Sequence, residues 1–364
     1  MSEEECHNDK GSHDKYITFE QFQRKDKHYK QQLMKSFSTV SSTDHKTILF
    51  EDTHQLLESM SDLTGLLQIL DKEDPYGPFF YGTGFIVRLQ KYGDEESDDF
   101  YAIVTVSTAY HIFNDEERSD IPSYKKVNEI WSRSTIKFKL DYNQGLNSSE
   151  INRDREGRGS DKSGDSSGSD APGLVADDTV SESSSSDSEI DKKDTLITFY
   201  GSQLLETDKD LDYKSDWCAF ECKITNTSHI KIVEKRLSSY QSCMSQLYLK
   251  SKLHADINLV VIIGHPHMKP KRISIGQHRK FKKSPEMEIL KEVRSHQIWC
   301  RYSYDNVACN GISGAPVFIW GQPISGFGYW FGHPHNHSET TDDEDDDHQK
   351  VCVGKSTIGT ENIV

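Results

Sequence analysis

The sequence has few of the features that would place it in a membrane or in an oxidising compartment. Its 364 residues include only 7 cysteines, an odd number at scattered spacings, which does not fit a disulfide framework. No run of about 18 apolar residues occurs, so no membrane-spanning helix is expected. Residues 1–15 are polar and acidic, unlike a secretory signal. We therefore expect a cytoplasmic or nuclear protein without a membrane partner.

Positive charge is also scarce. The chain has 43 Lys and Arg against 59 Asp and Glu, which gives a formal net charge of -16. Proteins that bind a phosphate backbone need a basic surface, so no nucleic-acid partner is expected. The basic stretches at 269–272 and 279–283 are interpreted as loops between strands. Hydrophobic residues make up only 34% of the chain, which indicates that part of it is solvated polymer and not core.

Three segments have too few apolar residues to offset the entropy of ordering them, and they are predicted to be disordered. They are residues 1–15, a Ser/Asp-rich insertion at 144–193, and an acidic tail at 336–364. In the insertion, each of three serines has an acidic residue three positions later, a pattern that suits acidophilic kinases; they are Ser184, Ser186 and Ser188. Phospho-regulation of the insertion is therefore a hypothesis.

The region 16–73 is predicted to be a helical extension. Aromatic and leucine residues recur at helical spacing over 16–37, and a second leucine stripe runs over 53–72, with Asp52 or Thr53 as its cap. These helices are expected to pack on the domain that follows. A helix that binds a partner protein is the alternative.

From residue 79 the pattern changes to short β-branched and aromatic runs separated by turns, which predicts strands. The runs lie at 80–90, 99–113, 134–142, 195–200, 216–224, 257–264, 271–276, 296–304, 315–320 and 323–331. Many short strands of this kind favour an all-β barrel or sandwich, here over residues 79–335 with the 144–193 insertion inside it.

The strongest local signal for chemistry is a serine between glycines, Gly311-Ile312-Ser313-Gly314, followed by Ala-Pro-Val-Phe. Glycines around a serine allow a tight turn in which two backbone N–H groups can point into one small space, as an oxyanion hole requires. The apolar run that follows buries the exit of the turn and fixes the serine on a rigid element. A serine that merely occupies a turn is the plain alternative.

Residues 311–318 resemble the Gly-x-Ser-Gly-x-Pro-Val block of the trypsin-like serine peptidases, in which His, Asp and Ser follow in that order. Upstream, Thr108-Ala109-Tyr110-His111 is similar to the family's Thr-Ala-Ala-His strand end, with Tyr110 in place of a small residue. Gly82 to Val87 is similar to its Gly-Thr-Gly-Phe-Ile strand. Asp216-Trp-Cys-Ala-Phe resembles the strand that carries the aspartate, and the sequence at 259–276 resembles the strand pair that opens the second barrel, as in intracellular members.

The resemblance implies an all-β fold of two packed six-stranded antiparallel barrels and a serine endopeptidase that needs no cofactor or metal. His111, Asp216 and Ser313 would form the triad, with the backbone N–H groups of Gly311 and Ser313 as the oxyanion hole. The separation of His111 and Asp216 is long for the family, but it becomes ordinary when the 144–193 insertion is left out. The partner would be a protein or peptide substrate.

For substrate binding, the resemblance implies that the segment Ser325, Gly326 and Phe327 pairs with an extended substrate backbone. Val307 would lie at the floor of the pocket for the residue before the scissile bond, which disfavours a basic preference. The residue before Ser313 is Ile312 and not an acid, so activation by N-terminal cleavage is not expected.

Three alternatives stay open. The chain could be an inactive member of the fold that serves as a protein-binding module, because Tyr110 and the strand after Asp216 are unusual. Cys309 could be the nucleophile in place of Ser313. Alternating histidines, His333, His335 and His337, and the pair His265 and His267 could bind a metal weakly, although loops without a metal are the favoured interpretation.

Overall fold

A computed structural model describes most of the chain outside the central insertion. The described residues are 15–73, 78–113, 130–142, 196–205, 216–283, 287–294, 297–324, 328–330, 335–344, 350–356 and 359–362. The predictions of disorder for residues 1–14 and 144–193 fall outside these ranges.

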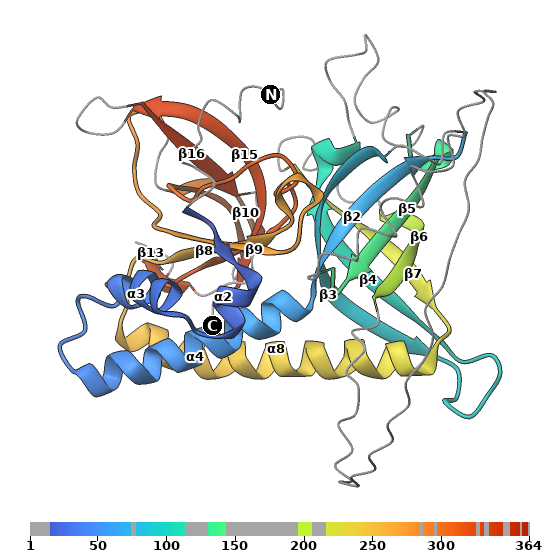
Figure 1. The fold of residues 1–364 in the computed structure, drawn as a ribbon, viewed down its shortest axis with the longest axis horizontal. Helices are drawn as coiled ribbons and strands as arrows, with labels where there is room; N and C mark the ends of the chain where they lie inside the picture. The colour runs from blue at the N-terminus through green and yellow to red at the C-terminus, as the bar shows by residue number, and fades with distance from the viewer. Residues whose placement is uncertain are drawn as a thin grey trace, which may run out of the picture. The chain divides into compact units, whose positions relative to one another are not determined.

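The first half of the fold is a closed barrel of six antiparallel strands (Figure 1). Its strands are β2 (Thr64–Asp71), β3 (Pro78–Tyr92), β4 (Tyr101–Ala109), β5 (Ser134–Leu140), β6 (Ile197–Leu205) and β7 (Trp217–Ile224), paired in the order β2-β3-β4-β7-β6-β5. Pairing of β5 with β2 closes the barrel, for example at Phe138 and Leu67. Inward side chains such as Phe138, Phe199 and Phe220 are fully buried and fill its interior.

The second half is a nine-stranded sheet in the described part of the chain. It contains β1 (Ile17–Thr18), β8 (Val260–Gly264), β9 (Arg272–Gly276), β10 (Met287–Arg294), β11 (Gln297–Tyr304), β12 (Pro316–Ile319), β15 (His335–Glu344), β16 (Lys350–Ser356) and β17 (Gly359–Asn362). A separate hairpin joins β13 (Gln322–Ile324) to β14 (Gly328–Trp330). The all-β class is confirmed, while the second half differs from the expected six-stranded barrel: its nine described strands, which include β1 and β17 from near the two chain ends, form a sheet and not a closed barrel.

The predicted helix over 16–37 is wrong in detail. The segment forms strand β1, helix α2 (Phe19–Gln23) and helix α3 (Lys27–Ser36). Lys25 has a positive φ of 49°, which ends the first helix, and Asp26 starts the second by accepting a hydrogen bond from the backbone N–H of Tyr29. Buried aromatic residues at helical spacing therefore belong to two short helices, not one.

The predicted helix over 53–72 is also partly wrong. Helix α4 spans Thr43–Asp62, and strand β2 begins at Thr64. The leucine stripe continues across this boundary at helical spacing, which is why the sequence pattern does not show the break. Leu66 and Leu67 are fully buried in the barrel, paired with Thr83 and Phe138, so tertiary pairing decides their conformation.

The acidic tail predicted to be disordered from 336 onward contains strands β15, β16 and β17, so that prediction is wrong for the described residues. Its polar composition carries no strand signal, but β15 pairs with β12 at Pro316 and Asn336 and then with β16. His335 to Ser338 are buried by this pairing. The partner strands, and not the local sequence, make this segment a strand.

A long helix, α8 (Thr227–Leu253), connects β7 of the barrel to β8 of the second sheet and was not predicted. Asn226 caps it by accepting a hydrogen bond from the backbone N–H of His229 at 3.1 Å. It runs beside α4 (Figure 1) and is tied to it by the Lys250–Asp52 ion pair and by a 3.0 Å hydrogen bond from Arg236 to the carbonyl oxygen of Asp62.

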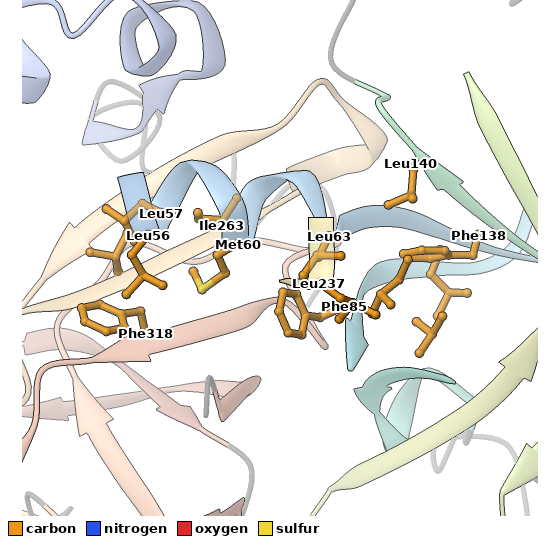
Figure 2. Close-up of a cluster of buried hydrophobic side chains, with 14 of the residues drawn as sticks. Leu56, Leu57, Met60, Leu63, Phe85, Phe138, Leu140, Leu237, Ile263 and Phe318 are labelled. Atoms are coloured by element: carbon orange, nitrogen blue, oxygen red, sulfur yellow. The ribbon is translucent and has the colours of Figure 1, made fainter. Parts of the chain in front are cut away.

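One continuous hydrophobic cluster joins both halves of the fold through these helices. Figure 2 shows Met60 of α4 and Leu63, which directly follows this helix, in a row of side chains that also contains Ile263 and Phe318 of the second sheet and Phe85 of the barrel. The two halves are therefore held in a fixed relation by shared apolar contacts, so residues contributed by each can form one site.

Candidate active site

The three predicted triad residues lie together, although they come from distant parts of the chain. His111 lies in a short 3-10 helix, η2 (Tyr110–Phe113), directly after β4, and Asp216 directly precedes β7. Pairing of Ala109 with Trp217 brings these two strand ends side by side. Nδ1 of His111 is 2.8 Å from Oδ2 of Asp216, and Nε2 of His111 is 2.9 Å from Oγ of Ser313. The three side chains form one hydrogen-bonded chain.

Asp216 accepts several hydrogen bonds that fix its carboxylate. Oδ1 accepts from the backbone N–H of His111 at 2.8 Å, and Oδ2 accepts from the imidazole of His111 and from the hydroxyl of Ser338. Burial on its own would raise the pKa of Asp216, but the hydrogen bonds and charge interaction with His111, together with Ser338, hold the pKa below its usual value of 3.8. The carboxylate is therefore ionised near neutral pH.

The ionised carboxylate determines the tautomer of His111. Because a carboxylate can only accept hydrogen bonds, Nδ1 of His111 must carry the proton that it donates to Asp216. The neutral ring then has its lone pair on Nε2, which faces the hydroxyl of Ser313 at 2.9 Å. This is the arrangement in which an imidazole can take a proton from a serine.

The peptide groups around Ser313 are oriented by their carbonyl oxygens. The carbonyl of Asn310 accepts a 2.7 Å hydrogen bond from the backbone N–H of His267, and that of Ile312 accepts a 2.8 Å bond from Ala315. In a trans peptide the N–H points opposite to the carbonyl. The N–H groups of Gly311 and Ser313 are therefore directed away from these two partners, which agrees with a role in binding an oxyanion.

Gly314 allows the serine turn to pack directly against the barrel. Its φ is +79°, and a Cβ atom there would lie 2.1 Å from Oγ1 of Thr108 and 2.3 Å from the carbonyl oxygen of Thr83. Gly311, with φ +94°, has a similar constraint against the carbonyl of His265 at 2.6 Å. Both positions need glycine for conformation and for space.

Thr83 of β3 holds the turn in place from the barrel side. Its backbone N–H donates to the carbonyl of Ser313 at 2.9 Å, and its hydroxyl donates to the carbonyl of Gly311 at 2.7 Å. Its own carbonyl accepts from the hydroxyl of Thr108 at 2.7 Å. Thr83 and Thr108 lie in the two segments that carried the resemblance upstream, so those segments position the nucleophile as well as His111.

Of the four residues predicted to bind substrate, only Val307 lies in the described part of the chain. Val307 is half-buried beside a cluster that includes Tyr304 and Cys309. Ser325, Gly326 and Phe327 lie outside the described residues.

The serine that contacts Asp216 is Ser338 of β15, in the segment expected to be a disordered tail. No local signal in this polar, histidine-rich stretch indicates that role; the pairing of β15 with β12 does.

Cys309 is buried, as are Cys218, Cys222 and Cys243, and these four are free thiols. The group that lies within hydrogen-bond distance of Nε2 of His111 is the hydroxyl of Ser313. The geometry therefore favours Ser313 over Cys309 as the nucleophile. Tyr110, the unusual residue before His111, is buried, and its backbone N–H donates to the carbonyl of Asp216 at 3.1 Å. The larger side chain is therefore accommodated without loss of the His111–Asp216 contact.

The described histidines among those considered as metal ligands lie in two segments, at 265–267 and 335–337. His265 is buried, with Nδ1 3.1 Å from the carbonyl oxygen of Lys269, and burial lowers its pKa to about 3. His335 and His337 are buried on β15, and His333 lies outside the described residues. Among the described residues, no group of three or more His, Cys, Asp or Glu side chains is arranged to hold a metal ion.

The strand order and the geometry above decide the fold. It is that of the trypsin-like serine peptidases. The closed barrel supplies His111 and Asp216, and the second sheet supplies Ser313, as in that fold. No helix within the described ranges is long and apolar enough to cross a membrane.

No family model matches the chain, and no curated protein matches it. Similar solved structures include Deg5, with 12% identity and a TM-score of 0.31 over 77% of this chain and 87% of that one. A serine endoprotease from Yersinia pestis has 11% identity and a TM-score of 0.27 over 76% of this chain and 60% of its own. The fold assignment rests on the strand pairing, because similarities this low add nothing to it.

Proposed function

We propose that this protein is a serine endopeptidase that cleaves peptide bonds through His111, Asp216 and Ser313. The observation that carries the proposal is the continuous hydrogen-bonded chain from Asp216 through His111 to Ser313, with contacts of 2.8 and 2.9 Å. Such contacts are the defining geometry of an activated serine nucleophile.

In the proposed reaction, Oγ of Ser313 attacks the substrate carbonyl carbon while Nε2 of His111 takes the hydroxyl proton. The N–H groups of Gly311 and Ser313 stabilise the negative charge that develops on the carbonyl oxygen. His111 then gives its proton to the leaving amine, and the acyl group remains on Ser313. Water activated by His111 releases the acyl group and regenerates the serine. Asp216 stabilises the imidazolium in both halves without itself taking a proton.

The second candidate is an inactive fold member that binds proteins. Its support is the pair of unusual residues around the triad, Tyr110 and Trp217. The hydrogen bonds of His111 to Ser313 and Asp216 favour the enzyme, because an inactive binding module has no need of an aligned nucleophile and base.

The test is labelling of the purified full-length chain with a fluorophosphonate probe, which reacts quickly only with an activated serine. Wild type is expected to label, while Ser313→Ala and His111→Ala are not. Ser202→Ala is the matched control, because Ser202 also has a hydroxyl bonded at the surface, to the carbonyl of Glu221 at 3.0 Å. Folded wild-type protein that stays unlabelled, with or without residues 144–193, would support the binding module instead.

A further inference from the structure

The connection between β8 and β9, residues 265–271, contains two consecutive residues in a strained backbone conformation. His267 has a φ of 53° and Met268 has a φ of 59°, in the left-handed region that non-glycine residues rarely adopt. Such conformations persist only where the surrounding contacts impose them, and they concentrate at functional sites. The contacts of this connection therefore indicate what the strain maintains.

His267 contacts the turn that carries Ser313. Its backbone N–H donates to the carbonyl of Asn310 at 2.7 Å, and that carbonyl belongs to the same planar peptide as the N–H of Gly311. Gly311 has a φ of +94°. Because glycine adopts both signs of φ readily, it allows this peptide more than one orientation. The bond from His267 therefore selects the orientation in which the N–H of Gly311 can bind an oxyanion.

The connection is attached to the barrel at its first residue. The backbone N–H of His265 donates to Oγ1 of Thr83 at 3.0 Å, and Nδ1 of its ring lies 3.1 Å from the carbonyl oxygen of Lys269. The ring of His265 also lies 5.8 Å from that of Tyr142. Tyr142 is the last described residue before the insertion predicted at 144–193. The connection therefore contacts both the residue that holds the serine turn and the point where the chain leaves the barrel.

At its other end, the connection is held by a buried lysine. Lys271 is 1% exposed, and its Nζ donates to the carbonyl oxygen of Ser61, near the end of α4, at 2.6 Å. A buried ammonium group needs opposite charge nearby. Two carboxylates, those of Asp141 and Asp62, are close enough to interact with Lys271 electrostatically. They come from the end of β5 and from the end of α4.

Arg236 of α8 joins the segments that carry these two carboxylates. Its guanidinium donates to Oδ2 of Asp141 at 2.9 Å and to the carbonyl oxygen of Asp62 at 3.0 Å. The side chains of Arg236 and Asp141 are each only 20% exposed, so solvent screens their attraction only partly. Asp62, Asp141, Arg236 and Lys271, here named the charge cluster, thus connect α4, α8 and the end of β5 to the residue before β9.

We propose that the charge cluster, acting through the 265–271 connection, sets the orientation of the 310–311 peptide and couples position 141, where the chain leaves the barrel, to the oxyanion hole. This inference rests on the proposed peptidase function, in which the N–H of Gly311 binds the developing oxyanion. Arg236 and Lys271 are positioning residues, because they act through the connection and not on the reacting atoms. The element with two states is the 310–311 peptide, as a coupling of two sites requires.

The charge cluster can transmit a change because its members are packed together. Loss of the Asp141 carboxylate or the Arg236 guanidinium leaves the remaining charges incompletely paired, and a buried unpaired charge is strongly unfavourable. Lys271 then moves toward solvent or other partners. Because the backbone at 267–268 is strained, it relaxes once the contacts that impose its conformation weaken. The bond from His267 to Asn310 is lost with that relaxation.

The test is the rate at which the full-length chain and its Arg236→Gln variant react with the fluorophosphonate probe. Loss of one oxyanion-hole donor costs about 100- to 1000-fold in rate, and since Arg236 acts indirectly we expect labelling to slow by at least about tenfold. Asp141→Asn should slow it in the same direction. Arg236→Lys, which keeps a positive charge beside Asp141, should recover part of the rate.

The pH dependence of labelling separates an effect on the oxyanion hole from damage to the triad. The pH at which labelling rises reports the protonation of His111, which the charge cluster does not contact. In Arg236→Gln the plateau should fall while the midpoint of the rise stays at the wild-type pH. A shifted midpoint would place the effect on the triad and overturn the inference.

The matched control is Lys250→Gln. Lys250 also joins α8 to α4, through its ion pair with Asp52, but it lies nearer the C-terminal end of α8. This variant should label at the wild-type rate, even if urea unfolding shows a loss of stability as large as that of Arg236→Gln. If both variants slow labelling equally, the two helices only support the fold and the inference is overturned.

Backbone hydrogen exchange tests the coupling without any catalysis. In a Ser313→Ala background, the N–H of His267 should exchange slowly, because it is bonded to Asn310. Adding Arg236→Gln should speed this exchange by at least about tenfold and leave the strands of the barrel unchanged. Unchanged exchange at His267 would refute the coupling even if the chain is a peptidase. A wild type that never labels, with exchange at His267 that depends on Arg236, would refute the peptidase and support the coupling.

Discussion

Replacing Gly314 with alanine tests whether the serine turn is set by direct contact with the barrel. A Cβ atom at this position would lie 2.1 Å from the hydroxyl oxygen of Thr108, 2.3 Å from the carbonyl oxygen of Thr83 and 2.8 Å from the backbone nitrogen of Ala109. Two of these three atoms belong to the backbone of barrel strands and cannot move aside as a flexible side chain would.

The cost has two parts that a matched variant separates. A positive φ costs a non-glycine residue about 1–2 kcal/mol, partly offset by the lower entropy of the unfolded chain. Gly93 has a φ of +82°, close to the +79° of Gly314, but its nearest neighbours would be 3.3 Å from a Cβ atom. Gly93→Ala should therefore lose about 1 kcal/mol. Gly314→Ala adds an overpacking cost of about 1–3 kcal/mol, for a total of about 2–4 kcal/mol.

Both variants are measured by urea unfolding followed by tryptophan fluorescence, and by the rate of fluorophosphonate labelling. Relief of the clash requires the turn to move away from Thr83, and displacement of a reacting group by about 1 Å can cost about 100-fold in rate. Gly314→Ala should therefore label at least about 100-fold more slowly, while Gly93→Ala labels like wild type. Equal losses of stability in the two variants, with normal labelling in both, would refute the proposed contact.

Three further predictions follow from the site and its surroundings. Ser338→Ala removes a hydrogen bond to the charged carboxylate of Asp216, worth about 1.5–3 kcal/mol. We therefore expect kcat/KM to fall by about tenfold or more and the acid limb of the pH–rate profile to shift to higher pH. An unchanged profile would contradict the role of Ser338. Cys309→Ala should label at the wild-type rate, and loss of labelling in a folded variant would restore Cys309 as a candidate nucleophile. Lys271 is buried, with Nζ 2.6 Å from the carbonyl oxygen of Ser61, and burial lowers its pKa from 10.5 to about 8. Between pH 8 and 10.5 the unfolded chain therefore binds more protons than the folded chain. The unfolding free energy of wild type relative to Lys271→Met should rise by about 3 kcal/mol over that window and stay constant below pH 8. Denaturation of both proteins at pH 7 and pH 10.5 measures this difference.

The catalytic residues that could be predicted from the sequence are those whose neighbours in the chain form a recognisable pattern. Ser313 has its glycines and apolar exit beside it, and His111 follows a strongly apolar strand. Asp216 was found through the resemblance of its strand and its order in the chain, and both Asp216 and Ser313 lie within hydrogen-bond distance of His111 in the structure. These positions are predictable because strand propensity and turn chemistry are local properties.

Positions defined by partners distant in the chain could not be predicted. Leu66 and Leu67 have helical spacing but are strand residues, because β3 and β5 pair with them. Ser338 and His337 lie in a polar segment whose conformation depends on β12 and β16. Helix α8 has a weakly amphipathic sequence and is stabilised by its contact with α4, through Arg236 and Lys250.

The connection between β5 and β6 has a consequence for the size of this chain. Leu140 and Ile197 are direct cross-strand partners, so the residues between them begin and end at neighbouring points of one hairpin. Joining such points costs only about 0.6 kcal/mol for each doubling of loop length. Deleting 144–193 would shorten the connection about ninefold and gain only about 2 kcal/mol by this relation. The barrel can therefore carry a long insertion, exchange it or lose it during evolution with little change in stability and no change in the positions of its strands.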